Sequence, residues 1–383
     1  MLESSFKKTL IIGLGLIGGS FARSLKSANL SKEIFAYDPD EDSVLNAIEE
    51  KIINGSFSIQ NDLSNFDFIV IACPLNFYKE IFLDLKKTIA KHTIIIDLGS
   101  LKSFTKEVLP KELEENFVAC HPIAGLEKSG FSNSSVELFK DKKFIICTQN
   151  ENSKTVKILA EKIGFIVEFL DAKLHDEIYA LISHLPQFLS FLSKDFVSKD
   201  IENEFFKNAF RLDNSSPKLW ESIFKLNAKN LEKFYLEFFD NLIDFIENLE
   251  SPSFNINDFK LDCLESEHSK PNCHLEQSER SLEFYPQEIS RFAQDDGWAG
   301  YYEKNLAENE KFLEENFAPI FFRFLMVISY LKINKIKEYK SFAGSGFKDF
   351  TSIAAIINYD EKKLLDLIKK NHTKIIKIFD SIS

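Results

Sequence analysis

Three glycines near the start of the chain, Gly13, Gly15 and Gly18, have the spacing G-x-G-x-x-G. A short apolar run precedes them and apolar residues with helical spacing follow, so the stretch predicts a strand, a tight turn and a helix. In such a turn the first glycine permits the sharp bend, the second lets backbone approach a diphosphate, and the third allows close helix–strand packing. The diphosphate would lie at the helix N-terminus, where free N–H groups and the helix dipole favour negative charge.

A second strand, at residues 33–38, is expected about 20 residues after the glycines and ends in an acid. Asp38 is placed to accept hydrogen bonds from a dinucleotide ribose and would repel a 2′-phosphate, which favours NAD over NADP. The alternative is a glycine turn in an α/β protein that binds no nucleotide. The other candidate cofactor contacts are Leu16, Ile17, Cys73 and Pro74.

Strand-like and helix-like stretches alternate through the first part of the chain, which predicts an α/β fold with a mostly parallel, doubly wound sheet. Further strands are expected at residues 66–73, 93–97, 117–120 and 143–147, with a helix at residues 79–90. Polar clusters that follow three of these strands contain Cys73, Ser100 and His121. They should converge at the carboxyl edge of the sheet, where such folds bind ligands.

The later part of the chain has helical patterning, so we predict a Rossmann domain at residues 1–168 and an all-α domain at residues 169–383. Apolar stripes at residues 172–193 and 217–249 need a partner, which is either a second copy of the chain or another helix of the same domain. Residues 251–302 lack periodicity and are expected to form a disordered insertion. Their Cys and His spacing matches no standard zinc site, so no metal is predicted.

The composition bounds the kinds of partner. With 383 residues, 44% hydrophobic and 28% charged, the chain has the length of two domains and the balance of a soluble globular protein. A net charge of −12 argues against nucleic acid or an anionic membrane as partner and is compatible with a small-molecule substrate. Five unevenly spaced cysteines form no disulfide framework, and the N-terminus lacks a signal-peptide pattern, so a cytoplasmic location is expected.

Several stretches, taken in order, resemble the prephenate/arogenate dehydrogenase family of tyrosine biosynthesis. They are residues 13–20, 97–102, 121–130, His175 with residues 183–186, and residues 206–220. The family has an N-terminal Rossmann domain and a helical, dimerising C-terminal domain. The resemblance implies an NAD-dependent oxidoreductase that converts prephenate to 4-hydroxyphenylpyruvate by oxidative decarboxylation, and a homodimer formed through the helical domain.

The resemblance also implies roles for individual residues. It places the catalytic base at His121, where an imidazole with an ordinary pKa near ~6.5 suits proton transfer at neutral pH. Ser100 would orient the same substrate hydroxyl. Arg211 matches the family's carboxylate-binding arginine, whose planar guanidinium can hold a carboxylate through two parallel hydrogen bonds. The other substrate contacts that the resemblance implies are His175, His184, Gln187 and Glu127.

The sequence departs from the family pattern at several positions. Gln187 stands where a histidine is common and Leu126 where threonine is common, so arogenate remains an alternative to prephenate as substrate. The glycine-rich stretch expected just before Arg211 occurs instead at residues 344–352, together with Lys348. A partial duplication of the helical region would explain this. A non-catalytic NAD-binding relative, or a Rossmann dehydrogenase of another family with a catalytic lysine, are further alternatives.

Overall fold

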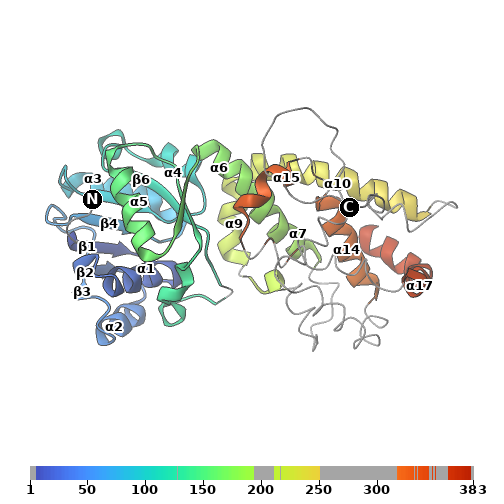
Figure 1. The fold of residues 1–383 in the computed structure, drawn as a ribbon, viewed down its shortest axis with the longest axis horizontal. Helices are drawn as coiled ribbons and strands as arrows, with labels where there is room; N and C mark the ends of the chain where they lie inside the picture. The colour runs from blue at the N-terminus through green and yellow to red at the C-terminus, as the bar shows by residue number, and fades with distance from the viewer. Residues whose placement is uncertain are drawn as a thin grey trace, which may run out of the picture. The chain divides into compact units, whose positions relative to one another are not determined.

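The computed structural model describes most of the chain. The described residues are 6–126, 128–193, 211–215, 217–250, 317–331, 333, 335–344, 347, 350 and 361–380. They fall into two compact units, Met1–His184 with Ser215–Glu232, and Leu185–Asn214 with Lys233–Ser383. The units are drawn in Figure 1, and each is described by itself below.

The first unit is built on a sheet that has, among the described residues, eight strands in the order β3-β2-β1-β4-β5-β6-β7-β8. All neighbours pair in parallel except β6 and β7, which are antiparallel. The strands are β1 (Phe6–Ile12), β2 (Ser31–Tyr37), β3 (Gly55–Ser56), β4 (Phe68–Ile71), β5 (Ile94–Asp97), β6 (Phe117–Pro122), β7 (Lys143–Ile146) and β8 (Ile166–Phe169). The predicted mostly parallel sheet is confirmed, whereas β3 and β8 were not expected from the sequence.

Helices cover both faces of this sheet. The helices are α1 (Leu16–Ser27), α2 (Glu41–Glu49), α3 (Tyr78–Thr88), α4 (Lys102–Val108) and α5 (Glu151–Ile163), with short 3₁₀ turns η1 (Leu75–Phe77), η2 (Lys111–Leu113), η3 (Phe131–Asn133) and η4 (Val136–Phe139). Side chains of α1, α2 and α5 share one apolar core with Val118 of β6. Phe117 points to the opposite face, because side chains alternate along a strand, and there its ring lies 5.4 Å from the ring of Phe82 in α3. The sheet is therefore doubly wound, as predicted.

Strand β6 changes partners along its length. Residues Phe117 to Ala119 pair in parallel with β5, and residues Cys120 to Pro122 pair in antiparallel with β7. The second half of β6 therefore extends past the point where β5 ends at Asp97. His121 lies in this extension, at the carboxyl edge of the parallel part of the sheet.

The rest of the described chain is helical, which confirms the predicted fold class. The segments are α6 (Ala172–Tyr179), the π-helix η5 (Ala180–His184), α7 (Leu185–Ser193), η7 (Arg211–Asn214), α9 (Pro217–Leu226), α10 (Ala228–Glu250), α14 (Phe317–Leu331), α15 (Ile336–Tyr339), η9 (Lys340–Phe342) and α17 (Glu361–Asp380). The helix expected at residues 172–193 thus contains a π turn, and the helix expected at residues 217–249 is interrupted at Asn227. Within the described part, no helix is both long and apolar enough to cross a membrane.

Two expectations of domain organisation stay predictions. The boundary between residues 168 and 169 is one of them. The insertion at residues 251–302 is the other, and it lies outside the described residues together with its cysteines and histidines.

Candidate active site

The glycine turn is tight on one side and open on the other. Gly13 has a φ of +100°, and a Cβ there would lie 2.6 Å from the carbonyl oxygen of Ala72. A Cβ on Gly18 would lie 1.9 Å from the carbonyl oxygen of Gly13, so neither position accepts a side chain. A Cβ on Gly15 would meet nothing within 4 Å. The backbone at Gly15 is therefore accessible to a ligand, as the spacing of the glycines predicted.

The first turn of α1 and the end of β2 complete this cradle. Gly15 is the N-cap of α1 and supplies no side-chain cap, so the first N–H groups, at Leu16 and Ile17, can bind a diphosphate. The Asp38 carboxylate accepts a hydrogen bond from the backbone N–H of Leu14 at 2.6 Å. The acid expected to bind a ribose is thus held directly beside the glycine turn. These features fit a dinucleotide.

Three buried or half-buried thiols lie along the sheet: Cys73 follows β4, Cys120 lies within β6 and Cys147 follows β7. Pro74, directly after Cys73, is the N-cap of η1. Burial raises the pKa of Cys73 to about 12 and that of Cys147 to about 12. Burial also holds the pKa of the Cys120 thiol well above its ordinary 9.0. All three are neutral at pH 7, so Cys73 can offer a cofactor packing surface but no charge.

A buried ion pair between Asp97 and Lys102 organises the turn that contains Ser100. The Asp97 carboxylate also accepts hydrogen bonds from Tyr78 Oη at 3.2 Å, Gly99 N at 3.2 Å and Cys120 N at 3.1 Å. Because its donors come from the turn and from β6, Asp97 ties the end of β5 to the strand that contains His121. Ser100 is half-buried in this turn.

His121 belongs to a hydrogen-bonded chain of side chains. Its Nδ1 lies 2.9 Å from Nε2 of His175, and Nδ1 of His175 lies 2.8 Å from Oδ1 of Asp176. The Asp176 carboxylate also accepts the backbone N–H groups of Lys102 and Ser103, each at 2.8 Å, which fixes its position. The structure thus brings together His121 and His175, which lie 54 residues apart.

His121 and His175, the two histidines of this hydrogen-bonded network, are neutral at pH 7. Burial holds the pKa of His121 well below its ordinary 6.5, and repulsion from the protonated form of His175, from Lys102 and from the protonated form of His184 lowers it further. Burial also lowers the pKa of His175, although the hydrogen bond and charge of Asp176 oppose this. Burial raises the pKa of Asp176, but the interactions with His175 and the hydrogen bonds from the backbone N–H groups of Lys102 and Ser103 together leave it below the ordinary 3.8. A neutral imidazole beside an ionised carboxylate can act as a base.

His184 lies at the end of the π-helix η5, and π turns are frequent at functional sites. Its Nδ1 accepts a hydrogen bond from Asn227 Nδ2 at 3.1 Å, and the same amide donates to the carbonyl oxygen of Asp176 at 2.8 Å. Burial lowers the pKa of His184 to about 3. His184 is therefore a neutral imidazole with its proton on Nε2, which makes it a hydrogen-bond donor.

The other candidate substrate contacts lie in the second unit. Arg211 begins the 3₁₀ turn η7 and is half-buried. The amide of Gln187 donates to the carbonyl oxygen of Leu212 at 2.9 Å, and Asp213 pairs with the buried Arg323 at 2.6 Å. Gln187 and Arg323 therefore hold the turn that presents Arg211. Glu127 and Lys348 lie outside the described residues.

Sequence reasoning missed three residues that organise the site: Lys102, Asp176 and Asn227. Lys102 was noted only as part of the stretch 97–102 that matches the family. The structure buries it in an ion pair with Asp97, because a buried lysine needs a carboxylate partner. Asp176 directly follows a candidate histidine, and this adjacency was the available signal. Asn227 separates α9 from α10, but no proline or glycine stands there to indicate a break in the sequence. Its contact with His184 joins residues 43 positions apart, so local spacing does not predict it.

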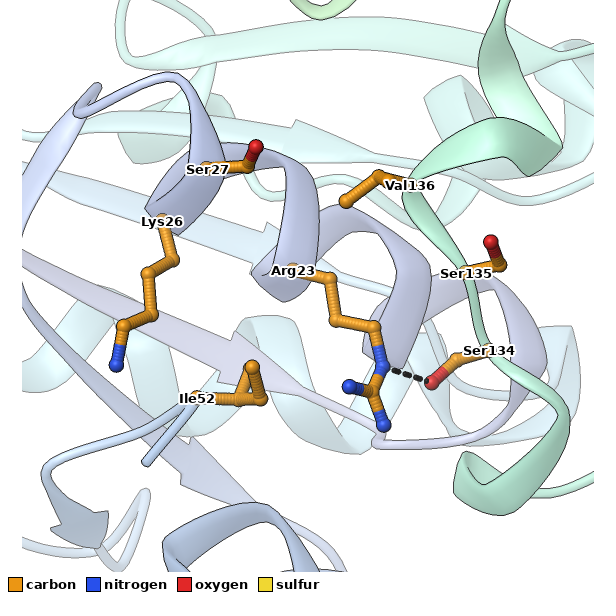
Figure 2. A pocket seen from close by; sticks show the side chains of 7 residues that line it. All are labelled: Arg23, Lys26, Ser27, Ile52, Ser134, Ser135 and Val136. Carbon is orange, nitrogen blue, oxygen red and sulfur yellow. Dashed lines mark hydrogen bonds between the residues drawn. The ribbon is translucent and has the colours of Figure 1, made fainter. Parts of the chain in front are cut away.

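A separate hollow of about 360 Å³ lies beside α1, and Figure 2 shows Arg23 directed across it towards Ser134. The Arg23 guanidinium donates to Ser134 Oγ at 2.7 Å and to Glu50 at 2.6 Å, and it lies 4.4 Å from the ring centroid of Phe131. The Arg23 charge is thus compensated by Glu50, and the Arg23 side chain links α1 to the segment that precedes η4.

A glycine cradle for a dinucleotide and a neutral base at the same edge of the sheet are what hydride transfer from an alcohol requires. The fold and the site together define a dinucleotide-dependent dehydrogenase with a helical second part. Comparison with known proteins narrows this class. Residues 21–169 match the nucleotide-binding domain of prephenate dehydrogenase and residues 171–256 match its dimerization domain.

Known relatives agree with these matches. The structure of prephenate dehydrogenase from Aquifex aeolicus is 30% identical, with a TM-score of 0.56, over 63% of this chain and 91% of that one. The same enzyme in complex with hydroxyphenyl propionate and NAD+ is 29% identical, with a TM-score of 0.57, over 65% and 92%. A prephenate dehydrogenase of Lactococcus lactis subsp. cremoris is 30% identical over 58% of this chain and 66% of its own length, just under two thirds.

The chain belongs to the prephenate dehydrogenase family. The family recognised from the sequence motifs is therefore confirmed. The roles of the individual site residues stay predictions.

Proposed function

We propose that this chain catalyses the NAD-dependent oxidative decarboxylation of prephenate to 4-hydroxyphenylpyruvate. The observation that carries the proposal is the neutral His121, which a buried carboxylate supports through His175 at the carboxyl edge of the sheet. The relative from Aquifex aeolicus, which binds NAD+ and a hydroxyphenyl ligand in its complex, supports the choice of cofactor and substrate class.

The residues that would hold NAD are the glycine turn, the first turn of α1 and Asp38. NAD supplies the hydride acceptor. The open backbone at Gly15 would receive the diphosphate, and Asp38 would accept hydrogen bonds from the ribose hydroxyls. Cys73 and Pro74, which follow β4, would pack against the cofactor without adding charge.

In the reaction, His121 would accept the proton of the ring hydroxyl while the hydride leaves the same carbon. Ser100 would hydrogen-bond this hydroxyl and fix its direction. The carbon becomes a carbonyl, and loss of carbon dioxide from the ring then yields an aromatic product. Arg211 would hold the ring carboxylate through two parallel hydrogen bonds. His184, Gln187 and Glu127 are the other proposed substrate contacts, and among them His184 offers an N–H donor. His175 was predicted as a further contact, but its two ring nitrogens bond His121 and Asp176, so its proposed role is to support His121.

We also propose a cytoplasmic homodimer that forms through the helical part of the chain. Residues 171–256 match a dimerization domain. Leu219 and Leu226, two helical turns apart on α9, are 55% and 39% exposed and offer apolar surface to such an interface. Sedimentation at micromolar concentration should give the mass of two chains, and a monomer would contradict the proposal.

The test of function is turnover with NAD. Wild-type protein should reduce NAD with prephenate, and arogenate should be assayed beside it because Gln187 and Leu126 leave the substrate side chain open. His121→Asn should lower kcat at least about 100-fold, the usual contribution of a general base, with unchanged Kd for NAD. Faster turnover of arogenate would reassign the substrate. Binding of NAD without turnover of either compound would indicate a non-catalytic relative.

A further inference from the structure

The hydrogen bonds around His121 determine which of its nitrogens carries the proton. An ionised carboxylate only accepts hydrogen bonds, so Nδ1 of His175 must carry the proton that bonds Asp176. In a neutral imidazole the other nitrogen is then an acceptor. Nε2 of His175 therefore accepts from His121, and Nδ1 of His121 carries the proton. The lone pair of His121 is left on Nε2.

We propose that His175 and Asp176 are positioning residues that fix this tautomer of His121, and that His175 takes up, through His121, the proton that leaves the substrate hydroxyl. Only the uptake of the substrate proton by His175 rests on the proposed function. The tautomer follows from contacts within the first unit, and it holds whichever hydroxyl compound is the substrate.

The proton transfer balances without a further reactant. The substrate O–H bond breaks, its proton binds Nε2 of His121, and its electron pair stays on oxygen to form the carbonyl as the hydride leaves carbon. The Nδ1–H bond of His121 breaks, and this proton binds Nε2 of His175. The result is a neutral His121 with its proton on Nε2, and a His175 imidazolium beside the Asp176 carboxylate.

The surroundings favour the positive charge on His175 rather than on His121. The groups that face His121 are Lys102, His175, His184 and the ring of Tyr179, and those that face His175 are Asp176, Asp97, Lys102 and Tyr179. His121 therefore has the cation Lys102 and neutral rings around it, whereas His175 has two carboxylates beside the same Lys102, one of them in direct contact. A charge on His175 is stabilised by Asp176.

The same protonation state arises when the pair takes a proton from solvent. His175 then carries protons on both nitrogens, and Nδ1 of His121 becomes the acceptor in their mutual hydrogen bond. Nε2 of His121 carries a proton in this state and has no lone pair for the substrate. The acidic limb of the pH profile therefore reports protonation of the pair, with the proton on His175.

The tautomer can be read directly, without substrate. Nitrogen-15 NMR of histidine-labelled wild-type protein should show, at pH 7 to 8, that His121 and His175 are both protonated on Nδ1 and unprotonated on Nε2. A His121 protonated on Nε2 would overturn the proposal. This measurement separates the proposal from the proposed function, because it is unaffected if neither prephenate nor arogenate is turned over.

Kinetic variants test the uptake of the proton by His175. His175→Ala removes both the acceptor and the proton site, and it should lower kcat roughly 100-fold. His175→Gln keeps an acceptor oxygen for His121 but binds no proton, so it should recover part of this loss, to roughly 10-fold below wild type, with KM within about twofold. A His175→Gln variant with wild-type kcat would overturn the uptake of the proton by His175.

The pH profile distinguishes this role from a structural one. In His175→Gln a proton can bind only to His121, whose surroundings disfavour the charge, so the acidic limb of kcat/KM should move to lower pH by at least about half a unit. A loss of kcat with an unmoved limb would indicate a merely structural role and overturn the proposal. His92→Gln is the matched control, because His92 is 60% exposed and remote in sequence, and both measurements should stay at wild-type values.

Discussion

Asp38 illustrates how one side chain can serve both the fold and ligand choice. Its Oδ2 accepts the N–H of Leu14 in the glycine turn, and its Oδ1 accepts the N–H of Asp40. The carboxylate is therefore held at the end of β2 rather than free to rotate away. A fixed negative charge at this place is compatible with the two hydroxyls of a ribose and repels a 2′-phosphate.

We therefore expect NAD to bind more tightly than NADP, and Asp38→Ser to narrow the difference. Serine removes the charge that repels the 2′-phosphate, and its hydroxyl oxygen can still accept one hydrogen bond from the ribose. Fluorescence titration of both dinucleotides measures the two Kd values. Asp42→Ser, an exposed acid in the first turn of α2, is the control and should leave both unchanged. Equal affinities in the wild-type protein would contradict the role of Asp38.

Arg211 and Lys348 are the two cations that the divided family motif offers for the ring carboxylate. Arg211 is the expected group because a guanidinium donates two parallel hydrogen bonds, and the turn that carries it is anchored by Gln187 and Arg323. Arg211→Ala should lower kcat/KM for prephenate roughly 30-fold or more, mainly through KM, which corresponds to ~2 kcal/mol.

Lys348→Ala is the comparison variant and should cost less than about threefold in kcat/KM. Steady-state kinetics with prephenate and a separate NAD titration distinguish loss of substrate binding from loss of cofactor binding. The reverse order of the two effects would move the carboxylate site to the C-terminal motif.

At the scale of elements, the ion pair of Asp97 and Lys102 joins the end of β5, the Ser100 turn and β6. Both side chains are 0% exposed. Removing one partner of such a pair leaves a buried charge without compensation, which typically costs 3–5 kcal/mol. Lys102→Met should therefore lower the free energy of unfolding by roughly 3–5 kcal/mol, as measured by urea denaturation.

The double variant Asp97→Asn with Lys102→Met tests this reasoning. It removes both charges, so it should be more stable than Lys102→Met alone, although the amide accepts fewer of the hydrogen bonds that Asp97 receives. A double variant no more stable than the single one would show that the destabilisation comes from lost packing and not from the isolated charge.

The sequence predicted those features that depend on local spacing. Gly13, Gly15 and Gly18 have the conformations and close approaches that their spacing required, and the main strands lie where short apolar runs occur. The antiparallel pairing of β6 with β7 was not predicted, because strand direction depends on a chain path of 20 residues without a clear pattern. The link from His121 to Asp176 was also missed, since it is a tertiary contact that no spacing encodes.

At the scale of the whole molecule, deletion of residues 255–298 tests the predicted insertion, which lies outside the described residues. A polar tract without periodicity contributes little to an apolar core. The shortened protein should keep its Kd for NAD and its kcat within about twofold of wild type. Titration and turnover measure these two quantities, and loss of soluble protein on deletion would show that the tract is part of a core.

The burial of Cys73, Cys120 and Cys147 has a consequence for this part of the protein under oxidising conditions. Oxidation and alkylation proceed through the thiolate, and burial holds Cys73, Cys120 and Cys147 in the neutral form at pH 7. These three sulfurs are therefore poor targets for peroxide and for electrophiles, even though Cys73 is a proposed contact of the cofactor. We therefore expect the hydride chemistry proposed for this edge of the sheet to need no reductant that protects these three thiols.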